Sequence, residues 1–196
     1  MKRLFDILFS FFVLLFFLPF GIIISFFILF TSRGGVFYTQ ERIGKNSQPF
    51  GLFKFRTMRK EADKVGKLTV GMRDPRITSI GYFLRKYKFD EIPQFINVLK
   101  GDMSIVGPRP EVKEYTDLYN KEQLKILEVK PGITDYASLA YFDENRLLGA
   151  SDDPQKTYIE EIMPAKLELN KKYLANPTIS HDIKIVWMTI MHVFKG

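Results

Sequence analysis

The longest apolar stretch lies near the N-terminus, over residues 7–30, and no charged side chain occurs in it. As a helix rising about 1.5 Å per residue, the stretch measures ~36 Å, enough to cross a hydrocarbon core about 30 Å thick. A signal peptide fits poorly, because the run is too long and no small-residue cleavage site follows it. The simplest prediction is one membrane-crossing helix.

A second interpretation is a helix that bends at Leu18-Pro19 and returns to its own leaflet. Proline removes a backbone hydrogen bond and kinks a helix. Neither arm crosses alone, since the longer one, before the proline, reaches only ~22 Å. Cations flank both ends, with Lys2 and Arg3 before the stretch and Arg33 after it. The positive-inside rule therefore gives no direction of crossing.

Alternating apolar and polar residues then predict a hairpin of two short strands, residues 36–42 and 50–56. Lys54 and Arg56 alternate with aromatic residues, so they share one face of the second strand. That face is either a solvated basic surface or a pair of cations aimed at phosphate. The charged residues 61–71 predict a mobile loop or short helix whose lysines are solvated or near anionic headgroups.

The rest of the chain predicts helices, because apolar residues recur at spacings of three and four. The expected helices cover residues 78–87, capped by Thr78, and residues 92–99, 111–127, 155–174 and 178–194. Residues 130–134 predict a turn and 143–154 a loop. The last helix carries an apolar stripe that either packs on the core or lies in the membrane interface, with Trp187 as anchor. The predicted class is α+β, mostly helical.

Composition narrows the chemistry. The 196 residues suit one domain with an appendage, and the absence of cysteine excludes disulfides and thiolate metal sites. The formal net charge of +7 favours an anionic partner: nucleic acid, anionic lipid or a phosphorylated substrate. The apolar segment favours the last two.

Two adjacent carboxylates, Asp90 and Glu91, precede the helix expected over residues 92–99. Asp90 is the predicted N-cap, Pro93 lies in the first turn and Gly101 follows the end. The N-terminus of a helix favours an anion by about 0.3–1 kcal/mol, so capping alone accounts for the pair.

The cations near this pair favour a function beyond helix capping. Arg85, Lys86 and Lys88 precede the carboxylates, and Arg109 follows the helix between two prolines that restrict its backbone. Cations on both sides of a carboxylate pair suit an enzyme that handles phosphates.

These residues carry a resemblance that covers nearly the whole chain in the right order. The motifs are residues 54–58 (KFRTM), 74–78 (DPRIT), 81–85 (GYFLR), 90–94 (DEIPQ), 97–104 (NVLKGDMS), 106–110 (VGPRP) and 130–134 (KPGIT). Together they are similar to the signature of the bacterial sugar transferases, the monotopic phosphoglycosyl transferases that start lipid-linked glycan assembly.

The resemblance implies transfer of a sugar-1-phosphate from a UDP-sugar to a polyprenol phosphate, usually undecaprenyl phosphate, with release of UMP. It implies that Asp90 is the nucleophile, that Glu91 positions groups or accepts a proton, and that Mg²⁺ sits next to Asp90. The candidate phosphate-binding residues are Arg85 and Arg109, with Lys54 and Arg56 as weaker candidates.

The resemblance also implies a location. Residues 1–32 would be a re-entrant membrane helix bent at Leu18-Pro19, where relatives often have Ser-Pro. Residues 33–196 would be a catalytic domain on the cytoplasmic face of the bacterial inner membrane. The partners would include the lipid bilayer and no nucleic acid, and a homodimer stays open. Relatives continue the last motif with Gly-Trp, whereas this chain has Asp135-Tyr136, which leaves the sugar open.

Two other functions remain at this stage. A membrane-tethered basic module that binds anionic lipid or nucleic acid without catalysis fits the charge and the apolar segment. It does not explain carboxylates amid the cations, because an anion-binding surface would exclude them. A phosphatase that works through an aspartyl phosphate is the second.

Overall fold

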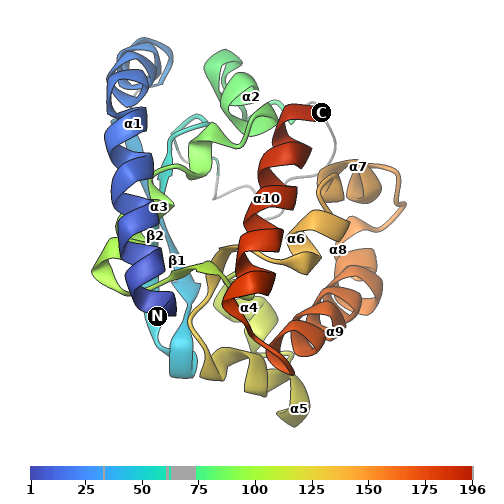
Figure 1. Ribbon diagram of the computed structural model, residues 1–196. Helices are drawn as coiled ribbons and strands as arrows, with labels where there is room; N and C mark the ends of the chain where they lie inside the picture. Colours follow the sequence, from blue (N-terminus) through green and yellow to red (C-terminus); the bar gives the residue numbers. More distant parts are fainter. Residues whose placement is uncertain (33, 61, 63–73, 196) are drawn as a thin grey trace.

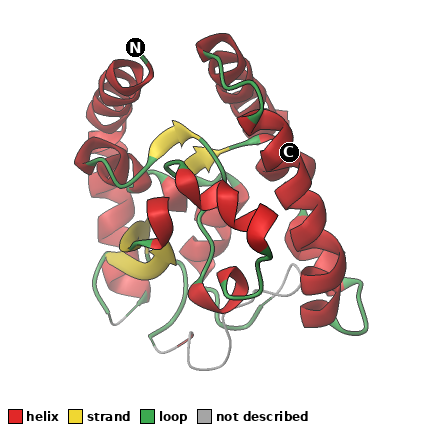
Figure 2. Ribbon diagram, turned by 90° about the horizontal axis from the view of Figure 1, so that it is seen from below, coloured by secondary structure: helices red, strands yellow, loops and turns green. Residues whose placement is uncertain are grey.

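The computed structural model describes residues 1–32, 34–60, 62 and 74–195. It is mostly helical, with helices around short strands (Figures 1 and 2). The strands are β1 (Phe37–Ile43), β2 (Pro49–Phe55), β3 (Ser104–Val106) and β4 (Gly132–Thr134). The helices are α1 (Lys2–Thr31), α2 (Ser79–Lys86), α3 (Gln94–Lys100), α4 (Lys113–Thr116), α5 (Lys121–Leu124), α6 (Tyr136–Ala140), α7 (Glu144–Gly149), α8 (Pro154–Thr157), α9 (Met163–Leu174) and α10 (Ile179–Lys195). The expectation for residues 61–71, apart from Ala62, and the flanking cation Arg33 lie outside the described residues.

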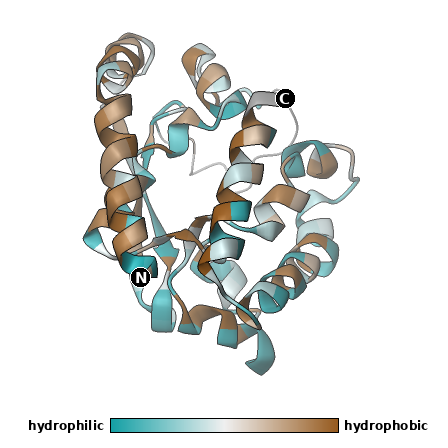
Figure 3. Cartoon of the chain, in the orientation of Figure 1, coloured by the Kyte–Doolittle hydropathy of each residue, from teal (hydrophilic) through white to brown (hydrophobic). Residues whose placement is uncertain are grey.

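The apolar N-terminal stretch forms one helix, α1, with Pro19 inside it. Its length and composition would allow it to cross a membrane. Most of its large apolar side chains are exposed, and the ribbon is brown along most of its length (Figure 3). Phe16 and Phe30 are 67% and 75% exposed. Exposed apolar surface on this scale is typical of a segment that contacts lipid, so α1 associates the protein with a membrane.

Both ends of α1 contact the rest of the protein. At the N-terminal end, the Lys2 ammonium donates to the carbonyl of Val106 at 3.0 Å and pairs with the buried Asp182 of α10. At the other end, the fully buried Ile28 packs against Phe55 of β2 and Leu84 of α2. Both ends of the helix are therefore anchored to the folded body, while its middle stays largely exposed.

A buried carboxylate near the start of α1 holds β3. Asp6 is 3% exposed and accepts hydrogen bonds from the Ser104 hydroxyl and the Ile105 amide, both at 3.0–3.1 Å. Hydrogen bonds of this kind offset the cost of burying a charge. Because β3 leads directly to Arg109, the membrane helix helps to set the position of that arginine.

The predicted hairpin is confirmed. Strands β1 and β2 pair antiparallel, with Phe37 opposite Phe55 and Ile43 opposite Pro49. The turn predicted over residues 130–134 is wrong in part, because β4 pairs parallel with β3 in a second small sheet. A Cβ atom on Gly132 would lie 2.1 Å from the Gly107 nitrogen. The two segments of the chain can therefore come this close only with glycine at position 132. Three-residue strands are too short for alternation to reveal them.

Two predictions in the helical half are wrong. Residues 111–127 form α4, α5 and the start of a 3₁₀ turn (Lys125–Glu128) instead of one helix. Asn120 breaks the pattern, because its side chain caps α5 by accepting from the Gln123 amide at 2.9 Å. The loop expected over residues 143–154 contains α7. The Thr78 cap of α2 and the last helix, α10, are confirmed, and a π-helical turn (Tyr158–Ile162) joins α8 to α9.

Candidate functional site

One large cavity, of about 680 Å³, brings together all the predicted polar site residues. Its walls come from α1, the β1–β2 hairpin, the segment before α3, the α6–α7 region and α10. The predicted residues among those that line it are Lys54, Arg56, Arg85, Asp90, Glu91 and Arg109. Cavities of this size hold ligands the size of a nucleotide or a drug. Leu18 and Pro19 do not line it; they lie within α1.

The carboxylates sit in a tight turn, so the expectation that Asp90 caps a helix is wrong. A 3₁₀ turn (Phe89–Glu91) carries both side chains, and α3 starts only at Gln94, after Pro93. Lys88, just before the turn, has the left-handed backbone conformation, with φ 56°. This conformation reverses the chain and directs the turn into the cavity. Gly101, with φ 95°, ends α3 as predicted.

Glu91 is held by two cations. The Arg109 guanidinium donates to both carboxylate oxygens, at 3.2 Å (Nη1 to Oε2) and 2.5 Å (Nη2 to Oε1). The Lys54 ammonium lies 3.4 Å from Oε1. Burial raises the pKa of Glu91, but the charges of Arg109 and Lys54 outweigh this and hold the pKa well below its ordinary value. Glu91 is therefore ionised, and its oxygens are occupied.

Asp90 has the opposite environment. It is 6% exposed, and among the described residues no hydrogen bond reaches its carboxylate. Burial and the neighbouring Glu91 raise the pKa of Asp90, while the charges of Lys54 and Arg85 partly offset that rise. A buried carboxylate with free oxygens in a cavity is a candidate nucleophile or metal ligand.

Arg85 approaches Asp90 from α2. Its Nε donates to the Thr57 hydroxyl at 2.9 Å, and the charge of Asp90 raises the pKa of the guanidinium against the larger effect of burial, which lowers it. A Cβ atom on Gly81 would lie 2.1 Å from the Thr57 carbonyl oxygen. Only glycine lets α2 come this close, and Arg85 follows one turn later on the same face.

Lys54 and Arg56 have different surroundings, although both line the cavity. Lys54 lies at Glu91, and burial lowers the pKa of its ammonium. The Arg56 guanidinium instead donates to the carbonyls of Gly35 and Phe37, at 3.0 and 3.1 Å, and lies over the Tyr38 ring. It links β2 to the segment between α1 and β1.

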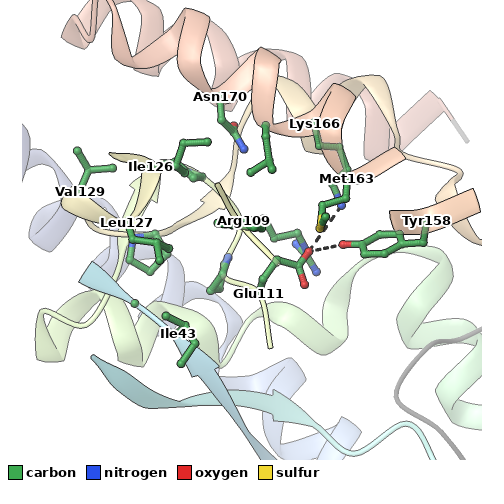
Figure 4. Close-up of a pocket in the computed structure, with 16 residues that line it drawn as sticks. Ile43, Arg109, Glu111, Ile126, Leu127, Val129, Tyr158, Met163, Lys166 and Asn170 are labelled. Carbon is green, nitrogen blue, oxygen red and sulfur yellow. Dashed lines mark hydrogen bonds and ion pairs between the residues drawn. The ribbon is translucent and has the colours of Figure 1, made fainter. Parts of the chain in front are cut away.

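A buried polar network begins two residues after Arg109, and sequence reasoning missed it. The neighbouring Glu111 accepts a hydrogen bond from the Tyr158 hydroxyl and lies 4.0 Å from the Lys166 ammonium, as the dashed lines in Figure 4 mark. Lys166 also pairs with Glu144 at 2.8 Å. Only the place of Glu111 directly after a motif could have drawn attention to it, because its partners are more than thirty residues away in the chain.

Magnesium fits this site only together with a phosphate. Among the described residues, no three histidine or carboxylate side chains gather into a metal cage. Mg²⁺ commonly takes one or two carboxylates plus substrate phosphates and water. The free carboxylate of Asp90 meets that requirement, whereas Glu91 is engaged by Arg109.

Comparison with known proteins identifies the family. The family model for bacterial sugar transferase matches residues 1–196. The chain is 38% identical over its whole length to the UDP-glucose:undecaprenyl-phosphate glucose-1-phosphate transferase of Escherichia coli, of which it covers 40%. It is 33% identical, also over its whole length, to the UDP-N-acetylgalactosamine-undecaprenyl-phosphate N-acetylgalactosaminephosphotransferase of Aeromonas hydrophila, of which it covers 44%.

The chain thus spans less than half the length of these two relatives. A relative of similar size is the exopolysaccharide production protein ExoY of Rhizobium meliloti, which is 33% identical over 96% of this chain and 83% of its own length. The match along the full chain, with residues of five of the seven motifs lining one cavity, shows that the chain belongs to the bacterial sugar transferase family.

Proposed function

We propose that the protein transfers a sugar-1-phosphate from a UDP-sugar to undecaprenyl phosphate, releases UMP and so starts the assembly of a lipid-linked glycan. The observation that carries this proposal is the contrast between Asp90, buried with free oxygens, and Glu91, clamped by Arg109. A merely anion-binding surface has no use for a buried, unpaired carboxylate. Two of the three relatives named above are transferases with undecaprenyl phosphate in their names.

The proposed reaction has two displacements. An oxygen of Asp90 attacks the β-phosphorus of the UDP-sugar, the bond from that phosphorus to the bridging oxygen breaks, and UMP leaves. The sugar phosphate is then esterified to Asp90. A phosphate oxygen of undecaprenyl phosphate next attacks the same phosphorus, the bond to Asp90 breaks, and the free carboxylate returns. The product is an undecaprenyl diphosphate sugar.

Other residues orient and neutralise phosphate oxygens. Arg85 and Lys54 act electrostatically on Asp90, and in this proposal they contact the diphosphate. Glu91 fixes the Arg109 guanidinium, so that one donor edge of this arginine has a defined position. Mg²⁺ bound at Asp90 with the diphosphate would offset the negative charge that develops on the departing UMP.

We further propose that α1 enters and leaves the membrane on one side, which we take as the cytoplasmic side of the inner membrane. The support is that Lys2 and Ile28, near opposite ends of the helix, both contact the same folded body. A straight crossing would leave one of these ends on the far side of the bilayer. Because the chain has no cysteine, single cysteines at Leu4 and Thr31 can be labelled separately. We expect both to react from the cytoplasmic side, and reaction from opposite sides would contradict the bend at Leu18-Pro19.

A UMP-release assay tests the activity. Purified protein would be given a panel of UDP-hexoses, with undecaprenyl phosphate in detergent and Mg²⁺. We expect UMP release with at least one sugar, which also identifies the sugar. Release of inorganic phosphate instead would favour an aspartyl phosphatase, and binding to anionic lipid without any release would favour the non-catalytic module.

A further inference from the structure

The large cavity has a second, apolar end that the chemistry above does not use. Its polar end holds Asp90, Glu91 and the cations. Beyond them the walls carry aromatic and branched aliphatic side chains, so that apolar atoms make up most of the exposed lining. A cavity with a charged end and an apolar end suits an amphiphilic ligand.

Two helices far apart in the sequence form the apolar walls. From α1, the lining residues are Phe9, Val13, Phe16 and Phe17, which fall on one face of the helix. From α10, the lining residues are Val186, Thr189, Ile190 and Val193, again one face. The Thr189 hydroxyl is satisfied, because it bonds to the Thr134 hydroxyl and to the Ile185 carbonyl. We call this space, with both stripes as its walls, the α1–α10 groove.

The floor of the α1–α10 groove is also apolar. Phe95, Ile105 and Ile133 line the same cavity and belong to the main hydrophobic core or pack against it. At one end the Phe9 ring lies 6.2 Å from the Phe95 ring. At the other end the Phe17 ring lies 5.8 Å from that of Phe89, the residue before Asp90. The groove therefore adjoins the carboxylate turn directly.

We propose that the α1–α10 groove binds the first isoprene units of the lipid acceptor, with the acceptor phosphate directed to Asp90. The proposal rests on the proposed function and adds the residues that select the acceptor chain. The eight-residue separation of Phe9 and Phe17 spans about 12 Å along α1, which accommodates the start of a polyprenyl chain and not its whole length. The remainder would lie in the bilayer beside the exposed face of α1.

Two observations favour a lipid chain over another occupant. The groove is continuous with the phosphate-handling end, so its occupant carries a phosphate near its apolar part. One wall, α1, is the membrane-associated helix, whose other apolar side chains are mostly exposed; Figure 3 shows the helix apolar along most of its length. An apolar chain can then pass from bilayer to groove without crossing water, which avoids the cost of hydrating it.

Direct labelling tests the groove without relying on catalysis. A prenyl phosphate with a diazirine on its second isoprene unit would be photolysed with the full-length protein in detergent, and the labelled peptides mapped. We expect the label on Val13 or Phe17 and on Val186 or Ile190. Label confined to outward positions such as Leu15, or spread evenly over α1, would overturn the proposal.

Bulky substitutions then test its part in the reaction. Val13→Trp and Ile190→Trp fill the groove, whereas Leu15→Trp and Met191→Trp place the same side chain at exposed positions that do not line the cavity. We expect the first pair to raise KM for undecaprenyl phosphate about tenfold. All four should form the phosphosugar adduct with UDP-sugar alone at the wild-type rate. Equal KM values in all four variants would contradict the groove, whereas a wild-type protein that forms no adduct would contradict the proposed function instead.

Discussion

The two charged regions of the cavity, one around Asp90 and one around Glu91, differ although the residues are adjacent in the chain. Both carboxylates are largely buried. Glu91 has a bidentate guanidinium and an ammonium, and its pKa is held low. Asp90 has no hydrogen bond to its carboxylate among the described residues, and its pKa is raised.

This difference gives the two carboxylates different properties: Glu91 holds Arg109 in place, whereas the oxygens of Asp90 are free to react. A clamped carboxylate cannot readily attack phosphorus, because its lone pairs already accept hydrogen bonds and its charge is neutralised. A buried carboxylate with a raised pKa and no hydrogen bond on its oxygens is more nucleophilic once ionised, and Lys54 and Arg85 only partly offset the rise in pKa. The protein therefore uses one acid to fix an arginine and keeps the other available. The following substitutions test this contrast, beginning with the largest expected effect.

Asp90→Asn should have the largest effect. The amide keeps the shape of the side chain and removes the nucleophilic oxygen, so we expect UMP release to fall by about 10³-fold or more. Circular dichroism and the thermal midpoint should stay close to wild type, because no hydrogen bond to Asp90 is lost within the described structure. Turnover near the wild-type rate would exclude Asp90 from the mechanism.

Arg109→Met should come next. The change leaves Glu91 buried beside Lys54 alone, and we expect activity to drop by about 10²–10³-fold. A low folded-state pKa stabilises the fold above the ordinary pKa, and this stability is lost as pH falls through the folded value. Without Arg109 the pKa of Glu91 rises, so the variant should start to lose stability at a higher pH than wild type. Thermal melts between pH 3 and pH 7 would measure this, and superimposable curves would contradict the clamp.

Glu91→Gln should reduce UMP release by about 10²-fold and leave some adduct formation. It removes the counter-charge of a largely buried guanidinium, which we expect to cost roughly 3 kcal/mol of unfolding free energy. Urea unfolding with Glu111→Gln as a comparison would show whether the loss is specific to this pair. A fully active variant of wild-type stability would reduce Glu91 to a simple surface acid.

Lys54→Met should have a smaller effect on rate, about tenfold, and a defined effect on pH dependence. The charge of Lys54 lowers the pKa of Asp90, so its removal should raise that pKa further. The nucleophile must be ionised, and the acid limb of the kcat profile should therefore move to higher pH. A limb that stays in place, or moves to lower pH, would show that the titrating group is not Asp90.

Arg56→Met should have the smallest effect, a change of less than about threefold in kcat/KM. Its guanidinium bonds to the carbonyls of Gly35 and Phe37 rather than to either carboxylate. The pair Lys54→Met and Arg56→Met is thus a matched test of two cations, one near the end of β2 and one directly after it. A larger loss with Arg56→Met would place its guanidinium on the substrate.

Much of this site was accessible from the sequence because its residues are close in the chain or carry strong local signals. Thr78 is a residue type that caps helices, and its position predicts the start of α2. The alternation of apolar and polar residues predicts the hairpin that carries Lys54. The cations around Asp90 and Glu91 lie within a few residues of them or in a proline-flanked motif. The family motifs then place them together.

The remainder depends on contacts between distant parts of the chain, which local patterns do not encode. Asp6 carries no local signal in the sequence, yet it is buried against β3. Glu111 was expected to begin a helix and instead accepts from Tyr158, 47 positions away. The contrast between Asp90 and Glu91 was likewise hidden, because it depends on where Arg109 points. The α1–α10 groove needed both helices in place.

Intact-mass spectrometry of the protein with UDP-sugar and Mg²⁺, but without any lipid acceptor, tests the central claim most directly. We predict a mass increase equal to one sugar phosphate, mapped by peptide analysis to Asp90 and removed when undecaprenyl phosphate is added. An active preparation that carries no adduct, or that carries it on another residue, would contradict the account.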